Sequence, residues 1–168
     1  MKFNNKLTLV GVFTSLFVFT VLFSSFADEL VHVGKLFSLR DVITNQGNVL
    51  PEKIQQTDGI DRRTLERIFE LNTSTLTTIE AYFRILMITI VTENEKNPEA
   101  IKILNEWLEF TKNQCKYDIE YLDSTLEDTR DQVVVDEINV TKESILSLKK
   151  IANSAIIEND AMLKQTTQ

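Results

Sequence analysis

The chain has 168 residues, a net charge of −7, one Cys and one His. That length suits a single domain, and 43% hydrophobic with 26% charged residues is typical of a globular protein, not of a disordered chain. One Cys excludes a disulfide framework, and one His excludes every site that needs two imidazoles. The acidic balance argues against nucleic acid as the main partner, because binding phosphates requires concentrated Lys and Arg.

The first 27 residues have a composition of their own. Two lysines are the only charges before Asp28, and the apolar run 7–23 follows them. Small residues, Ser25 and Ala27, then stand at the positions that signal peptidase reads before a cut. We therefore predict a cleaved signal peptide, Met1–Ala27. Because an exported chain with one Cys cannot rely on disulfides, we expect a bacterial protein that is periplasmic or secreted.

The same segment also fits an uncleaved membrane anchor. Residues 7–27 carry no charge and, at about 20 residues, are long enough to span a hydrocarbon core. Lys2 and Lys6 would then hold the N-terminus in the cytoplasm. In this alternative the chain is membrane-anchored by a single N-terminal span and contacts the membrane only through residues 7–27.

Glycine and proline are placed unevenly in the rest of the chain. From Ile60 to the C-terminus there is no Gly, and the only Pro is Pro98. A stretch of that length without residues that break helices predicts long helices. Residues 28–59 hold three glycines and Pro51, and we expect a short irregular lead-in arm there. The predicted organisation is thus a signal peptide or anchor (1–27), an arm (28–59) and a helical domain (60–168).

Helix-start signals divide the helical domain into segments 60–95, 98–129 and 132–165. Asn97 before Pro98 and Glu99 is the clearest of these signals, because Asn caps a helix and Pro suits its first position. A turn near 128–131 gives three helices of matched length, which bury their whole apolar faces when they pack side by side. We predict an all-α fold, an antiparallel three-helix bundle, with a long hairpin-like coiled coil as the alternative.

Apolar residues at heptad spacing mark the expected core. In the first helix they are Phe69, Leu76, Phe83 and Ile90, with Ile79 and Leu86 in a second column that has Asn72 as a polar end. In the second they are Ile101, Leu104, Leu108, Cys115, Ile119, Leu122 and Leu126. In the third they are Val134, Ile138, Thr141, Ile145, Leu148, Ala152, Ala155, Asn159 and Met162. Cys115 is thus expected to be a small buried residue, with a reactive or disulfide-linked thiol as the alternative.

Catalytic patterns are absent from the sequence. It has no Gly-x-Ser-x-Gly turn, no phosphate-binding glycine loop and no His-Glu-x-x-His helix. We therefore expect neither an enzyme nor a cofactor or metal site.

The segment 82–91 is apolar on nearly every side. Such a helix must be covered all round, and a three-helix bundle supplies only two neighbours. Either the arm covers the remaining face, or a second subunit or a partner protein does. The residues expected to bind a partner are Tyr82, Arg84, Ile85, Met87 and Ile88.

Two functional hypotheses follow from these patterns. The first is an exported, non-enzymatic helical protein that acts through protein–protein interaction or self-association, in the bacterial envelope or outside the cell. With the anchor retained, it becomes a membrane-anchored coiled-coil scaffold. The second is a ligand-sensing bundle that binds a small apolar molecule between its helices, lined by Phe83, Met87 and Trp107.

Overall fold

A computed structural model describes residues 27–91 and 97–166, which form four α-helices and contain no strand. The helices are α2 (Ala27–Gln56), α3 (Gly59–Val91), α4 (Pro98–Asp128) and α5 (Gln132–Thr166). The chain divides into two units, Met1–Gly34 and Lys35–Gln168, and the second contains the bundle described below. The all-α fold is confirmed. The expected count of three helices is wrong, because the described residues contain a fourth, α2.

The predicted irregular arm is helical up to Gln56. Gly47 and Pro51, which suggest turns in the sequence, lie inside α2. Pro51 lacks an N–H and its ring crowds the preceding turn, which inside a helix costs about 3 kcal/mol. Against that loss, α2 buries a face whose members recur every three or four residues, namely Leu36, Leu39, Ile43, Gln46 and Leu50. Burial of this face outweighs the local preference for a turn.

A tight turn joins α2 to α3. Thr57 donates a hydrogen bond from Oγ1 to the carbonyl of Lys53 at 2.7 Å, which satisfies one of the last carbonyls of α2. Gly59 then adopts a φ of +67°, a left-handed conformation that favours glycine. This turn lets α3 run back along α2.

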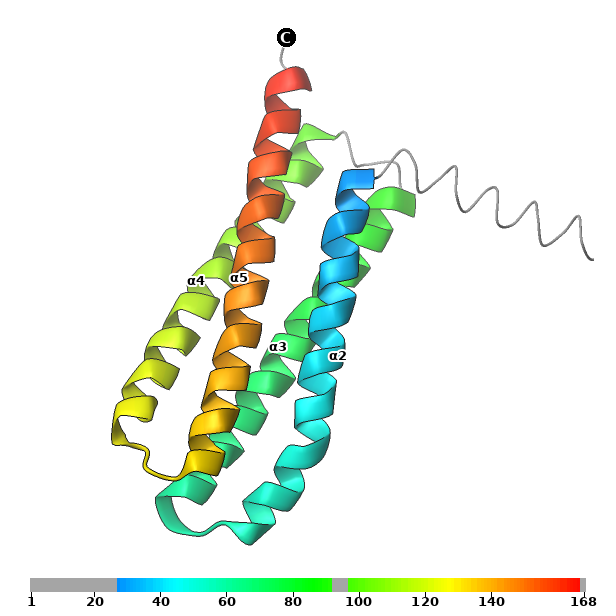
Figure 1. Ribbon diagram of the computed structural model, residues 1–168. Helices are drawn as coiled ribbons and strands as arrows, with labels where there is room; N and C mark the ends of the chain where they lie inside the picture. The colour runs from blue at the N-terminus through cyan, green and yellow to red at the C-terminus, as the bar shows by residue number, and fades with distance from the viewer. Residues whose placement is uncertain (1–26, 92–96, 167–168) are drawn as a thin grey trace, which may run out of the picture. The chain divides into compact units, whose positions relative to one another are not determined.

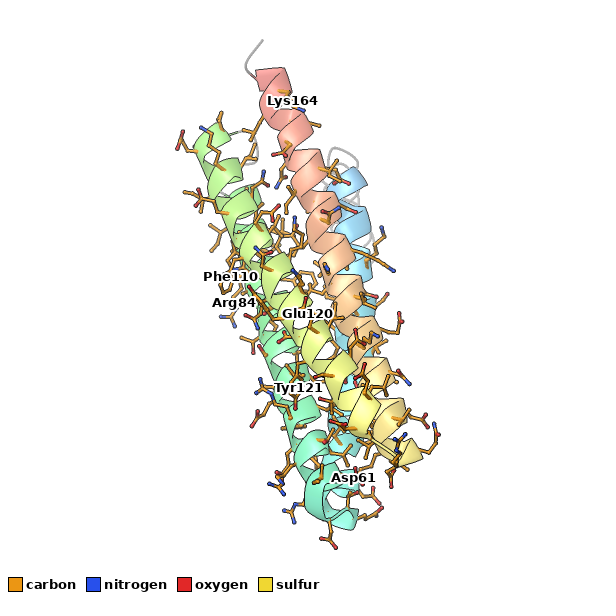
Figure 2. The ribbon with its side chains drawn as sticks, turned by 90° about the vertical axis from the view of Figure 1, so that its left-hand side faces the viewer. Asp61, Arg84, Phe110, Glu120, Tyr121 and Lys164 are labelled. Atoms are coloured by element: carbon orange, nitrogen blue, oxygen red, sulfur yellow. The ribbon has the colours of Figure 1, made fainter. Side chains whose placement is uncertain are left out.

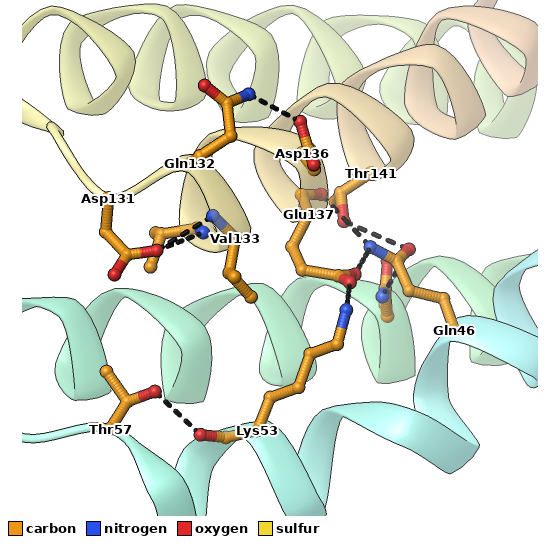
Figure 3. A network of polar contacts seen from close by, with 11 residues as sticks. Gln46, Lys53, Thr57, Asp131, Gln132, Val133, Asp136, Glu137 and Thr141 are labelled. Carbon is orange, nitrogen blue, oxygen red and sulfur yellow. Dashed lines mark hydrogen bonds and ion pairs between the residues drawn. The ribbon is translucent and has the colours of Figure 1, made fainter.

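The three helices predicted from the sequence are confirmed as α3, α4 and α5. Asn97 caps α4, because its side chain accepts a hydrogen bond from the backbone N–H of Glu99 at 3.0 Å. The turn predicted near 128–131 is also present. Asp131 accepts from the N–H groups of Val133 (2.8 Å) and Val134 (3.2 Å), and so caps α5 (Figure 3).

Successive helices run in opposite directions (Figure 1). α3 and α5 contact each other, and α4 packs closely along α5 and less closely along α3. Figure 2 shows the bundle turned by 90°, with α4 toward the viewer. α2 packs on α3 and α5 through the hydrogen bonds described below. α4 therefore lies closer to α5 than to α3, which leaves a more open groove between α3 and α4.

The core confirms most of the predicted register and corrects one column. The core positions predicted for α4 and α5 are buried, apart from Ile119, Leu126 and Met162, which are partly buried. On α3 the buried face is Leu65, Ile68, Leu71, Asn72, Thr75, Ile79 and Tyr82. The column predicted from Phe69, Leu76 and Phe83 lies beside this buried face. Phe69 is 38% exposed, and Leu76 and Phe83 are partly buried. Phe83 of the predicted column faces α2, where its ring centroid lies 4.6 Å from that of Phe37.

A buried polar layer lies where α2, α3 and α5 meet (Figure 3). The side-chain nitrogen of Gln46 donates to the backbone carbonyl of Glu137 at 3.0 Å and to its Oε2 at 2.6 Å. The oxygen of Gln46 accepts from Asn72 at 2.9 Å and from Thr141 at 3.2 Å. Lys53 forms an ion pair with Oε1 of Glu137. Because these bonds form only in one alignment, they fix the register of α2 against α3 and α5.

The predicted signal peptide or anchor falls almost wholly on residues 1–26, which lie outside the described residues. Of the helices that the structure describes, none combines the length and the apolar character needed to cross a membrane.

Candidate interaction surface

α4 carries a second apolar stripe besides its core face. Its members recur at alternating spacings of four and three, and so share one side of the helix. We call Ile103, Trp107, Phe110, Gln114, Tyr117 and Tyr121 the outer stripe of α4. Ile103 and Phe110 are each 67% exposed, Tyr117 is 64% exposed and Tyr121 is 40% exposed. Large apolar side chains gathered on one exposed face are typical of an interaction site.

Two ring contacts place this stripe along the groove between α3 and α4. Trp107 stacks on Tyr82 of α3, with ring centroids 5.6 Å apart. Further down the groove, the guanidinium of Arg67 lies 5.7 Å from the ring centroid of Tyr121. Each contact joins one residue of the stripe to α3. The outer stripe therefore forms one wall of the groove.

A small pocket lies in the floor of this groove, between the two contacts. It encloses about 70 Å³ and is lined by Ser74, Thr75 and Thr78 of α3, by Trp107, Phe110, Thr111, Gln114, Cys115 and Asp118 of α4, and by Leu148 of α5. Small-molecule sites usually enclose roughly 300–1,000 Å³. The pocket is thus a shallow dent in an extended surface, of a size to accept one side chain.

Burial shapes the chemistry of two groups in this pocket. Cys115 is a buried free thiol, and burial raises its pKa to about 12. The predicted core position of Cys115 is confirmed, and a thiol that stays protonated at neutral pH is a poor nucleophile. Burial also raises the pKa of Asp118, opposed by a hydrogen bond from Gln114 and by the charge of Arg67. The pocket therefore holds a thiol that stays protonated and a carboxyl that binds its proton more tightly than usual.

The predicted partner-binding residues do not form one exposed patch. Tyr82 is 4% exposed and covered by Trp107, and Ile85 is partly buried against the core. Arg84, Met87 and Ile88 are exposed, the last two at 58% and 63%. These three are therefore the exposed members of the predicted set.

The exposed residues of the predicted set divide between two sides of α3. Ile88 follows Ser74 by two heptads, and Ser74 lines the groove with α4. Met87 follows Phe83 by four residues, and Phe83 faces α2. By helical spacing, Ile88 therefore extends the groove beside α4, whereas Met87 lies toward α2.

Figure 2 shows Arg84, Phe110 and Tyr121 along the same edge of the molecule, where α3 and α4 run side by side. Arg84 is thus the charged residue of the predicted set that lies beside the outer stripe. The surface consists mainly of α4 residues, with Arg84 on its α3 side.

The three residues expected to line an apolar ligand site do not converge. Phe83 contacts Phe37 of α2, Met87 is mostly exposed, and Trp107 stacks on Tyr82 at the α4 side. These contacts belong to different sides of α3.

The sequence predictions missed the outer stripe of α4. Its signal was present, because Ile103, Phe110 and Tyr117 recur at heptad spacing. A helix with two apolar stripes is ambiguous, however, since either one can face the core. The structure resolves the ambiguity by burying Leu104, Leu108 and Cys115 and leaving the outer stripe exposed apart from Trp107, which is partly buried.

Comparisons with known proteins returned no match: no protein-family model matches the chain, nor does any curated protein or solved structure. The function must therefore be argued from the residues of this chain.

Proposed function

We propose that this chain is an exported, non-enzymatic helical protein that binds another protein chain through the groove between α3 and α4. The observation that carries the proposal is the exposure of the outer stripe of α4, above all Phe110 and Tyr117. Aromatic side chains are enriched at interfaces, because they bury a large area and lose little conformational freedom.

The exposed area supports a binding role. Three partly exposed aromatic residues and Ile103 offer on the order of 400 Å² of apolar side chain in one stripe. Leaving that area in water forgoes about 10 kcal/mol at 25 cal/mol/Å². This is comparable to the net stability of a whole domain, and so favours a surface that is covered in use.

The chemistry of the chain favours binding over catalysis. Its one cysteine is buried with a raised pKa. The pocket in the groove is too small for an ordinary substrate, and its walls are serine, threonine and apolar side chains together with Gln114 and Asp118. Export is supported by the composition of residues 1–27, with the periplasm or the cell exterior as destination and a retained anchor as the alternative.

Site-specific photocrosslinking tests the proposal. The full chain is expressed in cells with a photoreactive amino acid in place of Phe110, and in a second strain in place of Ile157. Ile157 of α5 is a matched control, because it is apolar and 62% exposed and lies on a different helix. We expect a light-dependent protein adduct of defined mass from position 110 and none from position 157. No adduct at position 110, or equal adducts at both positions, would contradict the proposal.

A further inference from the structure

Charged residues on the two sides of the groove between α3 and α4 indicate what kind of chain binds there. About half of the charges of α3 and α4 are paired within their own helix, as Arg62–Glu66, Arg67–Glu70, Lys102–Glu99, Lys112–Glu109 and Lys116–Glu120. Six exposed charges of α3 and α4 make no ion pair with another described residue: Arg63, Glu80 and Arg84 on α3, and Glu106, Glu127 and Asp128 on α4. Glu80 precedes Met87 by one heptad and so lies with it toward α2, away from the groove.

Glu106 precedes Phe110 of the outer stripe by four residues, and Glu127 follows Glu106 by three heptads, so both lie by helical spacing along the α4 side of the groove. Arg63 precedes Arg84 by three heptads and shares its side of α3. The α3 border of the groove thus offers two cations and the α4 border two anions.

These cations and anions lie at matching heights along the groove. Because Tyr82 stacks on Trp107, these two residues lie at the same height along the antiparallel helices α3 and α4. Arg84 follows Tyr82 by two residues and Glu106 precedes Trp107 by one, so the two heights differ by about 1.5 Å at 1.5 Å rise per residue.

The contact between Arg67 and Tyr121 gives the same result for Arg63 and Glu127. Arg67 lies over Tyr121, Arg63 precedes Arg67 by four residues and Glu127 follows Tyr121 by six. The heights of Arg63 and Glu127 therefore differ by about 3 Å. At both ends of the groove a cation on α3 is level with an anion on α4.

We propose that the occupant of the groove is a second copy of this chain, related by a two-fold axis that runs parallel to the bundle. This inference rests on the proposed function. Such a rotation keeps every residue at its own height and places α3 of one copy opposite α4 of the other. Arg84 then faces Glu106 of the second copy, and Arg63 faces Glu127 of the second copy. Symmetry repeats each contact, which gives four ion pairs.

The same rotation brings the outer stripes of the two copies together, between the ion pairs on either side. The two stripes contribute on the order of 800 Å² of apolar side chain. With the charged borders this reaches the roughly 1,000 Å² that a specific interface needs. A two-fold axis perpendicular to the helices would instead place α4 against α4, and its acidic border against itself. Charge complementarity therefore selects the parallel axis.

Charge reversal tests the dimer. Sedimentation equilibrium is measured on protein purified from cells that express the full-length sequence. We expect a dimer for the unaltered protein, and a dissociation constant raised about tenfold by Arg84→Glu or by Glu106→Arg, because each change places like charges together twice. The double variant Arg84→Glu/Glu106→Arg restores opposite charges and should return the constant to within about threefold of the original.

Arg40→Glu serves as the matched control, because Arg40 is an exposed arginine of α2 and its reversal should leave the dimer intact. Circular dichroism checks that every variant keeps its helices. A double variant no better than the single ones, or an Arg40→Glu effect of the same size, would overturn the parallel arrangement.

The photocrosslinking experiment separates this inference from the proposed function. An adduct at Phe110 with twice the mass of the chain supports the second copy. An adduct at Phe110 with a different protein, together with a monomeric mass in sedimentation, overturns the second copy and leaves the proposed function intact. No adduct at Phe110 overturns both.

Discussion

The side-chain nitrogen of Gln46 lies 2.6 Å from Oε2 of Glu137, across a separation of 91 positions in the sequence. Both side chains are buried, at 6% exposure each. The bond joins the helix that the sequence failed to predict, α2, to the last helix of the bundle. It shows that the core depends on polar contacts as well as on apolar packing.

Replacement of Gln46 by Leu is expected to lower the free energy of unfolding by roughly 3 kcal/mol, because each buried polar group left without a partner costs about 1–3 kcal/mol. Gln46 is the partner of Asn72, Thr141 and Glu137 at once. Urea unfolding followed by circular dichroism measures the loss. Gln55→Leu on the exposed side of α2 is the control and should stay within about 0.5 kcal/mol of the unaltered protein. A comparable loss in both variants would mean that the polar layer has no special role.

Replacement of Asn72 by Leu, unlike that of Gln46, should not lower the free energy of unfolding. Asn72 donates one hydrogen bond to Gln46, whose oxygen keeps Thr141 as a donor. Its own Oδ1 is buried without a hydrogen-bond partner among the described residues. Removing that oxygen offsets the lost bond, so the free energy of unfolding should stay constant or rise by up to about 1 kcal/mol. The same urea titration applies, and a loss above about 2 kcal/mol would show that Asn72 stabilises the layer.

Asp118 gives a pH-dependent prediction. Burial raises its pKa, so the folded state binds the proton of this carboxyl more tightly than the unfolded state does. Stability therefore falls as pH rises from the ordinary pKa of 3.8 through the raised value. Asp118→Asn mimics the protonated form and should raise the melting temperature at neutral pH, with the gain vanishing below the ordinary pKa. Asp41→Asn, at an exposed position of α2, should show no such gain. A lower melting temperature for Asp118→Asn at neutral pH would contradict the prediction.

Cys115 should not react with thiol reagents in the folded protein. Burial raises its pKa from 9.0 to about 12, and the side chain is 4% exposed. Titration with a chromogenic disulfide at mildly alkaline pH should detect the thiol only after denaturant is added. Ser124→Cys, at an exposed position of α4, should add one thiol that reacts at once. Because the raised pKa belongs to the folded state, stability should also fall as pH rises from 9.0 toward 12. Rapid reaction of the unaltered protein would show that the core opens at Cys115.

The sequence by itself determined the features that depend on neighbouring residues. Asn97 and Pro98 mark the start of α4 because capping is a local interaction. The heptad spacing of α5 predicts most of its buried residues from Val134 to Asn159, because apolar side chains repeat along that face, but it misses Glu137, Ser144 and Ile151.

Only the tertiary structure decided the features that depend on contacts between distant segments. Gly47 and Pro51 suggest a turn locally, but burial of Leu36, Ile43 and Leu50 against the other helices keeps them in α2. α2 also contacts α3 through Gln46–Asn72 and Phe37–Phe83, and spacing within α3 cannot indicate these contacts. α4 has two apolar stripes that spacing alone cannot rank, so its exposed surface was also decided by the bundle: the helix can bury only one stripe against α3 and α5, and Phe110 belongs to the other.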